Sequence, residues 1–188
     1  IDAACIGNHE FDHGWDNMLS QIKKANFPIL NGNLFFEGTD DLVWDNPYLI
    51  LERAGLKIGI IGLHGKFAFY DTINFKMTEG IEARDEEEYL RQYIKELEPI
   101  TDIIILAVHQ GMPGRQSTIG LTDVERNLYK DILLAQNVSG VDIIVTGHAH
   151  QGTEKALVSN GTIIVSTNAT ATELGKLQVM FDTEQKKK

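Results

Sequence analysis

The sequence predicts an α/β protein in which a mixed sheet, or two packed sheets, is flanked by helices. Three short runs rich in β-branched residues predict buried strands, at residues 1–6, 102–108 and 142–146. Segments with helical spacing of apolar residues lie between these runs, and short apolar runs around Asn160-Gly161 predict a hairpin near the carboxyl end. An order of strands alternating with helices, followed by strands alone, therefore favours an α/β domain with mixed sheets.

The first half of the chain contains both helical and extended apolar patterns. Apolar residues recur at helical spacing after Gly14, so a helix is expected over residues 14–25. Ala54-Gly55-Leu56 separates two apolar runs and predicts a hairpin. Residues 63–82 show no clear period, so a loop is expected there. The expected strands of this half are 27–34, 48–53 and 57–62.

Beyond residue 82, the chain is expected to contain two helices and five strands. Leu90, Tyr93, Ile94 and Leu97 fall at i, i+3, i+4 and i+7, which predicts an amphipathic helix over residues 83–97. Thr122 to Glu125 matches a capping box and opens a helix. The apolar face of that second helix holds Val124, Leu128, Ile132 and Ala135. A last strand is expected over 176–181, and residues 183–188 form a tail or linker.

Composition bounds the class of protein. A length of 188 residues is enough for one domain with a sizeable core. The formal net charge is −10, from 17 basic and 27 acidic residues, which argues against a nucleic-acid duplex or an anionic lipid as the main partner. No apolar run is long enough to span a bilayer. The single cysteine, Cys5, is interpreted as a small buried hydrophobe and not as a catalytic thiol.

Histidines stand at the ends of the three predicted strands. Asn8 and His9 follow the first strand, His109 follows the second, and His148 and His150 follow the third. Ligands of open α/β sheets bind beyond the carboxyl ends of the strands, so these side chains are expected to converge. Taken singly, each histidine is more often structural, but together they indicate a site for zinc, manganese or iron. Their ligand atoms should cluster within roughly 7 Å of a common point.

His9 is interpreted separately because it is adjacent to Asn8 and cannot easily share its coordination sphere. Asp12 lies three residues further on and could accept a hydrogen bond from the His9 ring, as general acid–base catalysis requires. Alternatively, Asp12 caps the helix that follows. Both interpretations are compatible, because a carboxylate has two oxygens.

Three motifs occur in the order found in calcineurin-like metallophosphoesterases: Gly7-Asn8-His9-Glu10-Phe11-Asp12, Val108-His109-Gln110-Gly111 and Gly147-His148-Ala149-His150. The continuation Glu10-Phe11-Asp12 resembles the branch of 5′-nucleotidases and 2′,3′-cyclic phosphodiesterases. The resemblance covers nearly the whole chain. It implies a four-layer α/β/β/α sandwich and a periplasmic or extracellular hydrolase that acts on nucleotides or other small phosphoesters.

Carried over by position, the resemblance also implies a site with two divalent metal ions of the Zn, Mn or Fe type. Asn8, His109 and His148 would bind one ion, and His150 would bind the other. A metal-activated hydroxide would attack phosphorus, while His9, oriented by Asp12, assists the leaving group.

The sequence departs from the family pattern before Gly7. The family begins with Asp-x-His and Gly-Asp motifs that supply a carboxylate bridging the two metals, and these motifs do not precede Gly7 here. Residues 1–182 are therefore expected to be the latter part of a catalytic domain without its N-terminal strands. Such a chain would bind at most one metal and turn over poorly. Its uncovered sheet surface would favour association with a partner.

Other polar residues receive weaker interpretations. His13 and His64 match no ligand position and are expected to be structural or on the surface. Asn31 and Asn33 either face the cleft or make turn and edge hydrogen bonds. Arg115 lies in a predicted loop and is interpreted as a solvated charge, although it could reach an anionic substrate.

Two other classes of function compete with the phosphoesterase. A metal-binding module without turnover would keep the ligands but not the chemistry, and an activity assay separates the two. A nucleotide-binding or dehydrogenase-like domain without metals is disfavoured, because no Gly-x-Gly-x-x-Gly follows the first strand and no Walker lysine motif occurs.

Overall fold

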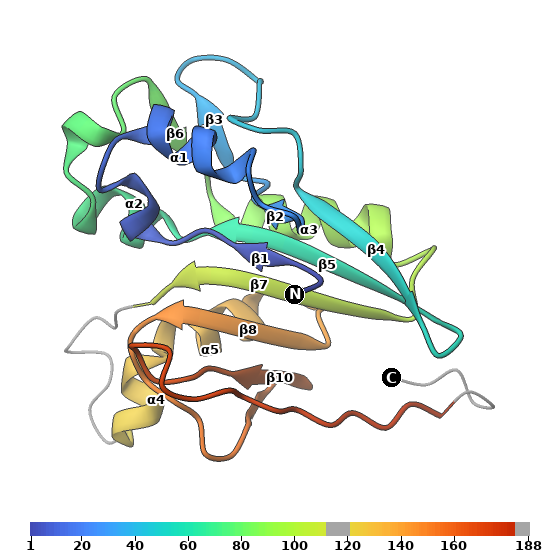
Figure 1. Cartoon of the computed structure of the whole chain (residues 1–188). Coiled ribbons are helices and arrows are strands. Elements are labelled where there is room, and N and C mark those ends of the chain that lie inside the picture. Colours follow the sequence, from blue (N-terminus) through green and yellow to red (C-terminus); the bar gives the residue numbers. More distant parts are fainter. Residues whose placement is uncertain (112–120, 183–188) are drawn as a thin grey trace.

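The computed structural model describes residues 1–111 and 121–182, and a six-stranded mixed sheet lies at its centre (Figure 1). The strand order is β4-β5-β7-β8-β10-β9. The four inner strands are parallel, whereas β4 and β9 pair antiparallel at the two edges. The bounds are β4 (Tyr48–Arg53), β5 (Leu56–His64), β7 (Ile103–Gln110), β8 (Ile143–His148), β9 (Leu157–Ser159) and β10 (Thr162–Val165).

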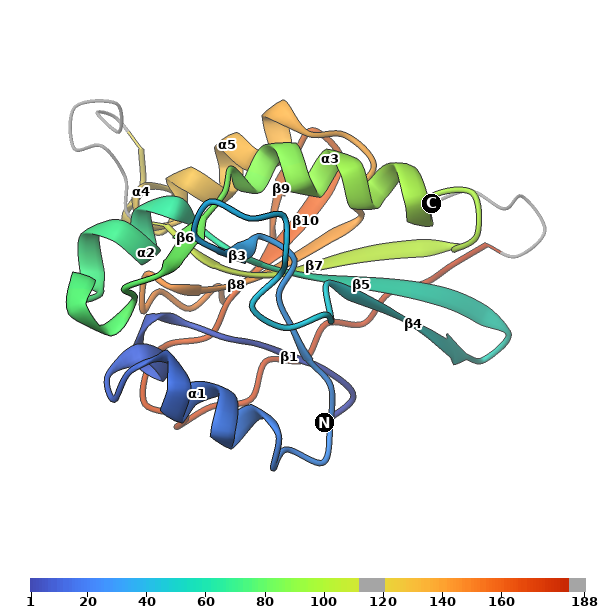
Figure 2. The ribbon, with the colours of Figure 1, turned by 90° about the horizontal axis from the view of Figure 1, so that it is seen from above.

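Different elements cover the two faces of this sheet (Figure 2). The helices α3 (Glu86–Leu97) and α5 (Tyr129–Asn137) lie on one face, and β1 (Ala4–Cys5) and α1 (Trp15–Ile22) lie on the other. The sheet and the two helices of the first face share a core of aliphatic side chains, which removes apolar surface from water. Its fully buried members include Ile61, Leu63, Leu90, Leu97, Ile104, Leu106, Ile144 and Ile164.

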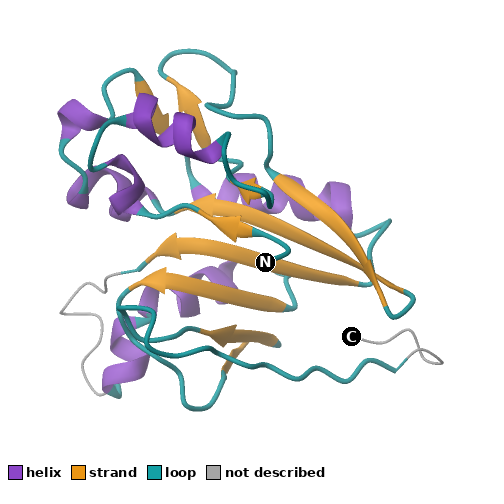
Figure 3. Cartoon of the chain, in the orientation of Figure 1, coloured by secondary structure: helices purple, strands orange, loops and turns teal. Residues whose placement is uncertain are grey.

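Smaller helices and strands lie beside the central sheet (Figure 3). Their side chains form a second apolar cluster. β1 pairs parallel with β2 (Ile29–Leu30), and β3 (Leu34–Phe36) pairs antiparallel with β6 (Ile81–Ala83). The buried side chains of this cluster include Ile6, Phe11, Met18, Leu34, Phe69 and Ile81. The remaining helical elements are η1 (Asn8–Phe11), α2 (Lys66–Thr72), η2 (Phe75–Met77) and α4 (Asp123–Asn127).

Local sequence signals account for the elements that were predicted correctly. The Asp85 side chain accepts hydrogen bonds from the backbone N–H groups of Glu87 and Glu88 and so caps α3. The capping box of Thr122 and Glu125 is present at the start of α4. Both predicted hairpins form, and each turn has two residues with positive φ, which suits the twist of the strands. The chain is therefore a mixed α/β protein with mixed sheets.

Several sequence predictions were wrong. Residues 63–82 are not a loop, because β5 extends to His64 and α2, η2 and β6 follow it. The helix after Thr122 is interrupted at Leu128, and the strand of residues 1–6 is reduced to Ala4–Cys5. Residues 176–181 form no strand within the described chain, and Met180 there is 93% exposed. The prediction rested on the apolar composition of the segment, and a strand also needs a neighbouring strand with which to pair.

The remaining expectations concern a membrane span, the four-layer arrangement and association with a partner. No helix within residues 1–111 and 121–182 combines the length and apolar composition needed to cross a bilayer. The four-layer arrangement and the association through an uncovered sheet surface both stay predictions. Val145 of β8, for example, is a 46% exposed valine in the central sheet.

Candidate functional site

Three polar side chains from three separate elements meet at the carboxyl ends of the inner strands β7 and β8. His109 Nε2 lies 2.8 Å from Asn8 Oδ1 and 3.1 Å from His148 Nδ1. His148 Nδ1 in turn lies 3.3 Å from Asn8 Oδ1. The three atoms therefore form a closed triangle, and the structure brings together the three residues that the sequence predicted for one coordination sphere.

Backbone register places these side chains. β7 and β8 are parallel, and His109 lies opposite Gly147 while Gln110 lies opposite His148. Asn8 begins η1, which starts three residues after the end of β1 on the other face of the sheet. Gly7 allows this approach, because a Cβ there would lie only 2.6 Å from His109 Cε1.

The triangle of donor atoms fits a metal ion. Ligand atoms held ~2.1 Å from a metal lie about 3.0 Å apart in octahedral and about 3.4 Å apart in tetrahedral coordination. The observed separations of 2.8, 3.1 and 3.3 Å match that range. The described residues contain no group of three His, Cys, Asp or Glu side chains that could hold a metal, because the third member here is the amide of Asn8. The donor set is thus neutral.

Burial keeps the two imidazoles of this site uncharged. Burial, followed by the neighbouring His64 and His148, lowers the pKa of His109 to about 3. Burial also lowers the pKa of His148, with His150 as the next cause. Both rings are therefore neutral near pH 7, which leaves a nitrogen lone pair available, as metal ligation requires.

The turn after β8 has an unusual backbone. His148 has a φ of +80° and His150 a φ of +54°, in the left-handed region that non-glycine residues rarely adopt. Strain of this kind clusters at functional sites. The His150 ring is exposed and close enough to affect the pKa values of His109 and His148, but within the described chain it makes no hydrogen bond with the triangle. Its assignment to a second metal stays a prediction.

His9 and Asp12 form a separate pair next to the triangle. His9 Nδ1 lies 3.0 Å from Asp12 Oδ2, and the two side chains are 73% and 57% exposed. The expected hydrogen bond is therefore present. The alternative that Asp12 caps the next helix is wrong, since the N-cap of α1 is Gly14 and no side chain caps it. Asp12 is instead free to orient the imidazole.

The other histidines have different environments. His13 is exposed, and His64 is fully buried, so its surface alternative is wrong. Burial lowers the pKa of His64 to about 4, and the ring packs edge-on against Phe11 and Phe69. His64 Nδ1 lies 3.1 Å from the Gly65 carbonyl. These contacts agree with the structural role expected for His64.

The asparagines and the cysteine also have structural environments. Asn31 Oδ1 accepts hydrogen bonds from the backbone N–H groups of Asn33 and Leu34. Asn33 bonds both backbone groups of His64. Both asparagines are buried and bond backbone groups, Asn31 in its own turn and Asn33 at the end of β5. Burial raises the pKa of the Cys5 thiol to about 12, which agrees with a non-catalytic residue. Arg115 lies outside the described residues.

One buried carboxylate was missed by the sequence reasoning. Asp131 of α5 is fully buried, and its Oδ1 accepts a hydrogen bond from Gln110 Nε2 at 3.0 Å. Burial raises its pKa to about 6, against the opposing effect of Gln110 and Thr146. A signal was available, because Asp131 falls at helical spacing between Leu128 and Ala135 on the predicted apolar face.

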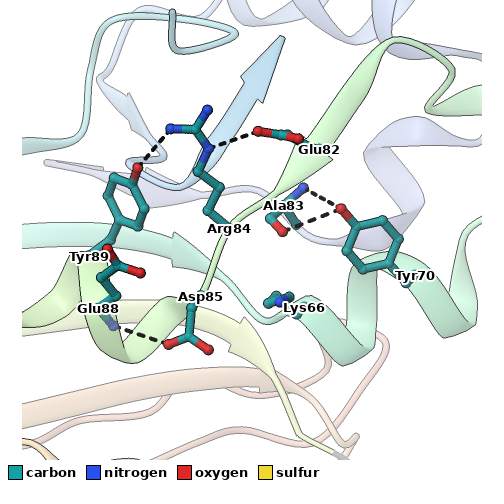
Figure 4. Close-up of a pocket in the computed structure, with 8 residues that line it drawn as sticks. All are labelled: Lys66, Tyr70, Glu82, Ala83, Arg84, Asp85, Glu88 and Tyr89. Carbon is teal, nitrogen blue, oxygen red and sulfur yellow. Dashed lines mark hydrogen bonds and ion pairs between the residues drawn. The ribbon is translucent and has the colours of Figure 1, made fainter. Parts of the chain in front are cut away.

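A separate polar cavity of about 470 Å³ lies between β6 and the first turns of α2 and α3 (Figure 4). Most of its polar groups already have partners. Arg84 bonds Glu82 and Tyr89, and the Tyr70 hydroxyl bonds the backbone of Ala83. None of the three triangle residues lines this cavity, so the cavity is separate from the strand-end triangle.

Most of the chain is similar to known proteins. The model of the calcineurin-like phosphoesterase family matches residues 2–152. A 5′-nucleotidase of Vibrio cholerae is 32% identical over 159 residues, which cover 80% of this chain and 26% of that protein. A 2′,3′-cyclic-nucleotide 2′-phosphodiesterase/3′-nucleotidase of Haemophilus influenzae is 27% identical over 161 residues, with 80% and 23% covered.

A solved structure is also similar. The calcineurin-like phosphoesterase YfkN from Bacillus subtilis matches with a TM-score of 0.67 and 26% identity, over 88% of this chain and 53% of that one. The chain spans about a quarter of the length of the two curated relatives.

Proposed function

The chain belongs to the calcineurin-like phosphoesterase family, and on that premise we propose that it is a metal-dependent phosphoester hydrolase of the 5′-nucleotidase kind. One observation carries the proposal: Asn8, His109 and His148 present three ligand atoms within 3.3 Å of one another. Such a set at the carboxyl ends of parallel strands is a suitable site for a divalent ion.

Asn8, His109 and His148 would hold one divalent ion, and in an intact two-metal site of the family His150 would contribute to the second. When bound, such ions withdraw electron density from a phosphoryl group and offset its negative charge. The local positive charge also explains how a chain with a net charge of −10 could accept an anionic substrate.

His9 is the proposed acid–base residue. Asp12 accepts the hydrogen bond from Nδ1 and so fixes the orientation of the ring. This arrangement leaves Nε2 available to pass a proton to the leaving oxygen of the substrate. The high exposure of His9 suits a residue that contacts a substrate and is not enclosed with the ligands.

The proposed substrates are nucleotides or other small phosphoesters, and a nucleic-acid duplex is not among them. This choice rests on the names of the relatives and on the acidic composition of the chain. A periplasmic or extracellular location rests on the family resemblance alone.

A second candidate is a metal-binding module without turnover. The neutral ligand set favours it, because two dications close together repel strongly unless anionic ligands lie between them. On the same ground we propose that the 188-residue chain by itself binds at most one metal and hydrolyses phosphoesters poorly.

Hydrolysis of 5′-AMP and of bis(p-nitrophenyl) phosphate with manganese or zinc tests both candidates. In an intact enzyme, His9→Asn should lower kcat by ~10²–10⁴-fold, the usual effect of losing an acid–base group, with metal content unchanged. His13→Asn is the matched control, since His13 is an exposed histidine of the same segment, and it should leave kcat unchanged. Loss of metal together with activity in His9→Asn would make His9 a ligand. Metal binding without any turnover by the parent would favour the second candidate.

A further inference from the structure

Asp131 is a buried carboxylate to which the proposed chemistry assigns no role. It is 0% exposed and lies in α5, beneath the carboxyl ends of β7 and β8. Burying a carboxylate costs free energy unless its hydrogen bonds are satisfied, and such residues are rarely fully buried. Its contacts therefore indicate what it does.

The main contact of Asp131 leads directly to the strand-end triangle. Asp131 Oδ1 accepts a hydrogen bond from Gln110 Nε2 at 3.0 Å, and Gln110 is itself only 2% exposed. Gln110 follows His109 in the chain and lies opposite His148 in the parallel ladder. One hydrogen bond thus fixes the residue that joins both proposed histidine ligands.

The backbone after His109 is packed against the same carboxylate. Gly111 has a φ of +106°, and a Cβ placed there would lie 3.4 Å from Asp131 Oδ2 and 3.9 Å from Ala149 Cβ. Ala149 lies between His148 and His150, so Gly111 is enclosed between α5 and the turn that carries those histidines.

A second contact lies one helical turn earlier. Asn127, the last residue of α4, donates a hydrogen bond from Nδ2 to Gln151 Oε1 at 2.9 Å. Gln151 directly follows His150. Asn127 and Asp131 therefore each hold the residue that comes immediately after a proposed ligand.

We propose that Asp131 is a positioning residue, which through Gln110 holds the His109 and His148 rings in the geometry that binds the metal. The metal in this inference rests on the proposed function, whereas the contacts of Asp131 with Gln110 and Gly111 do not depend on it. Residues that hold metal ligands in place typically change affinity by about 10–100-fold when they are removed. Asp131 touches no ligand atom of the triangle and acts through the end of β7.

The test compares three variants with the parent chain. Asp131→Ala removes the hydrogen bond to Gln110, whereas Asp131→Asn keeps an acceptor for it and removes only the charge. Thr162→Val is the matched control: Thr162 is 2% exposed and its hydroxyl bonds the Val141 carbonyl at 2.8 Å, in a part of the sheet away from the triangle. Each protein is measured metal-free by NMR, for nuclear Overhauser effects between His109 and Asn8 or His148, and then titrated with Co²⁺ by visible absorption.

We expect Asp131→Ala to lose the Overhauser effects and to bind Co²⁺ about 10–100-fold more weakly. Asp131→Asn should keep the Overhauser effects and bind Co²⁺ with an affinity within about twofold of the parent. Thr162→Val should lower the melting temperature and leave the Overhauser effects and the Co²⁺ affinity unchanged. Unchanged Overhauser effects in Asp131→Ala, or equal losses in Thr162→Val, would overturn the proposal. If the parent binds no cobalt while the Overhauser effects follow the expected order, the positioning role holds and the proposed function fails.

Folding of Asp131→Ala is not essential to this test. If that variant does not fold, Gln110→Ala replaces it, since it removes the same hydrogen bond from the other side. Gln110→Ala must then lose the Overhauser effects that Asp131→Asn keeps, and retention of those effects by Gln110→Ala would overturn the proposal.

Discussion

Replacing Gly7 by alanine isolates the position of one proposed ligand. Gly7 has a φ of −113° and a ψ of −168°, an extended conformation that alanine adopts without strain. The new methyl group, however, would lie 2.6 Å from His109 Cε1, 2.8 Å from Nδ1 and 2.9 Å from Nε2. The substitution therefore acts through a steric contact with the imidazole of His109 and not through backbone strain at residue 7.

The size of the effect follows from these distances. Carbon atoms at optimal contact lie about 3.5–4.0 Å apart, so the ring or the β1–η1 segment must move by about 1 Å. Overpacking of this kind typically costs about 1–3 kcal/mol of unfolding free energy. Because Asn8 follows Gly7 directly, the same shift opens the triangle, and we expect Mn²⁺ or Zn²⁺ affinity to fall about 10–100-fold.

Isothermal titration calorimetry measures the affinity, and chemical denaturation measures the unfolding free energy. Gly59→Ala is the matched control: its Cβ would lie 3.2 Å from Leu97 Cδ1, in the same sheet but against an apolar side chain. It should lower stability while leaving metal affinity within about twofold of the parent. Parental metal affinity in Gly7→Ala would refute the assignment of His109 as a ligand in the observed geometry.

Two further predictions concern pH and a turn. Burial lowers the pKa of His64 to about 4 from an unfolded value of about 6.5, so between these values the unfolded chain takes up a proton that the folded chain does not. The unfolding free energy should therefore fall with decreasing pH across that window, and in His64→Asn it should fall less steeply, by up to ~1.4 kcal/mol per pH unit. Parallel pH profiles from denaturation of the two proteins would contradict this. Gly161 has a φ of +83°, and a Cβ added there would meet open space, so Gly161→Ala should lower the unfolding free energy by about 1–2 kcal/mol through backbone conformation alone. Equal denaturation midpoints would argue against the left-handed turn between β9 and β10.

Elements with strong local signals could be predicted from the sequence. The spacing of Leu90, Tyr93, Ile94 and Leu97 indicated the buried face of α3, and Asn160-Gly161 indicated the turn of the last hairpin. α2 was missed because it has only seven residues, too few for a helical period to stand out, and its buried residues are Ala68 and Phe69. The failed strand at 176–181 shows the opposite error, since a suitable composition does not provide a pairing partner.

The candidate site could be predicted in part for a topological reason. Parallel strands bring their carboxyl ends to one edge, so histidines at the ends of two such strands had to come close together. The burial of Asp131 and its hydrogen bond to Gln110 depend on how α5 packs on the sheet. No local sequence pattern encodes that packing. Asp12 was open to two interpretations until the structure showed that α1 begins at Trp15, too far along the chain for Asp12 to cap it.

The ring of His109 owes its position to backbone on two sides. A Cβ at Gly7 would lie 2.6 Å from the ring, and a Cβ at Gly147 would lie 3.2 Å from its Nδ1. The imidazole is thus held between two residues without side chains, one before Asn8 and one before His148. The partners it meets are 101 and 39 positions away in sequence. His148 reaches it from the end of β8, and Asn8 reaches it from η1, which comes after β1. A site whose ligands are held in this way needs little ordering when a metal arrives, because preorganisation reduces the entropic cost of binding. Removal of metal should accordingly leave the fold of the sheet unchanged. Substitution of either glycine should lower metal affinity while the chain stays folded.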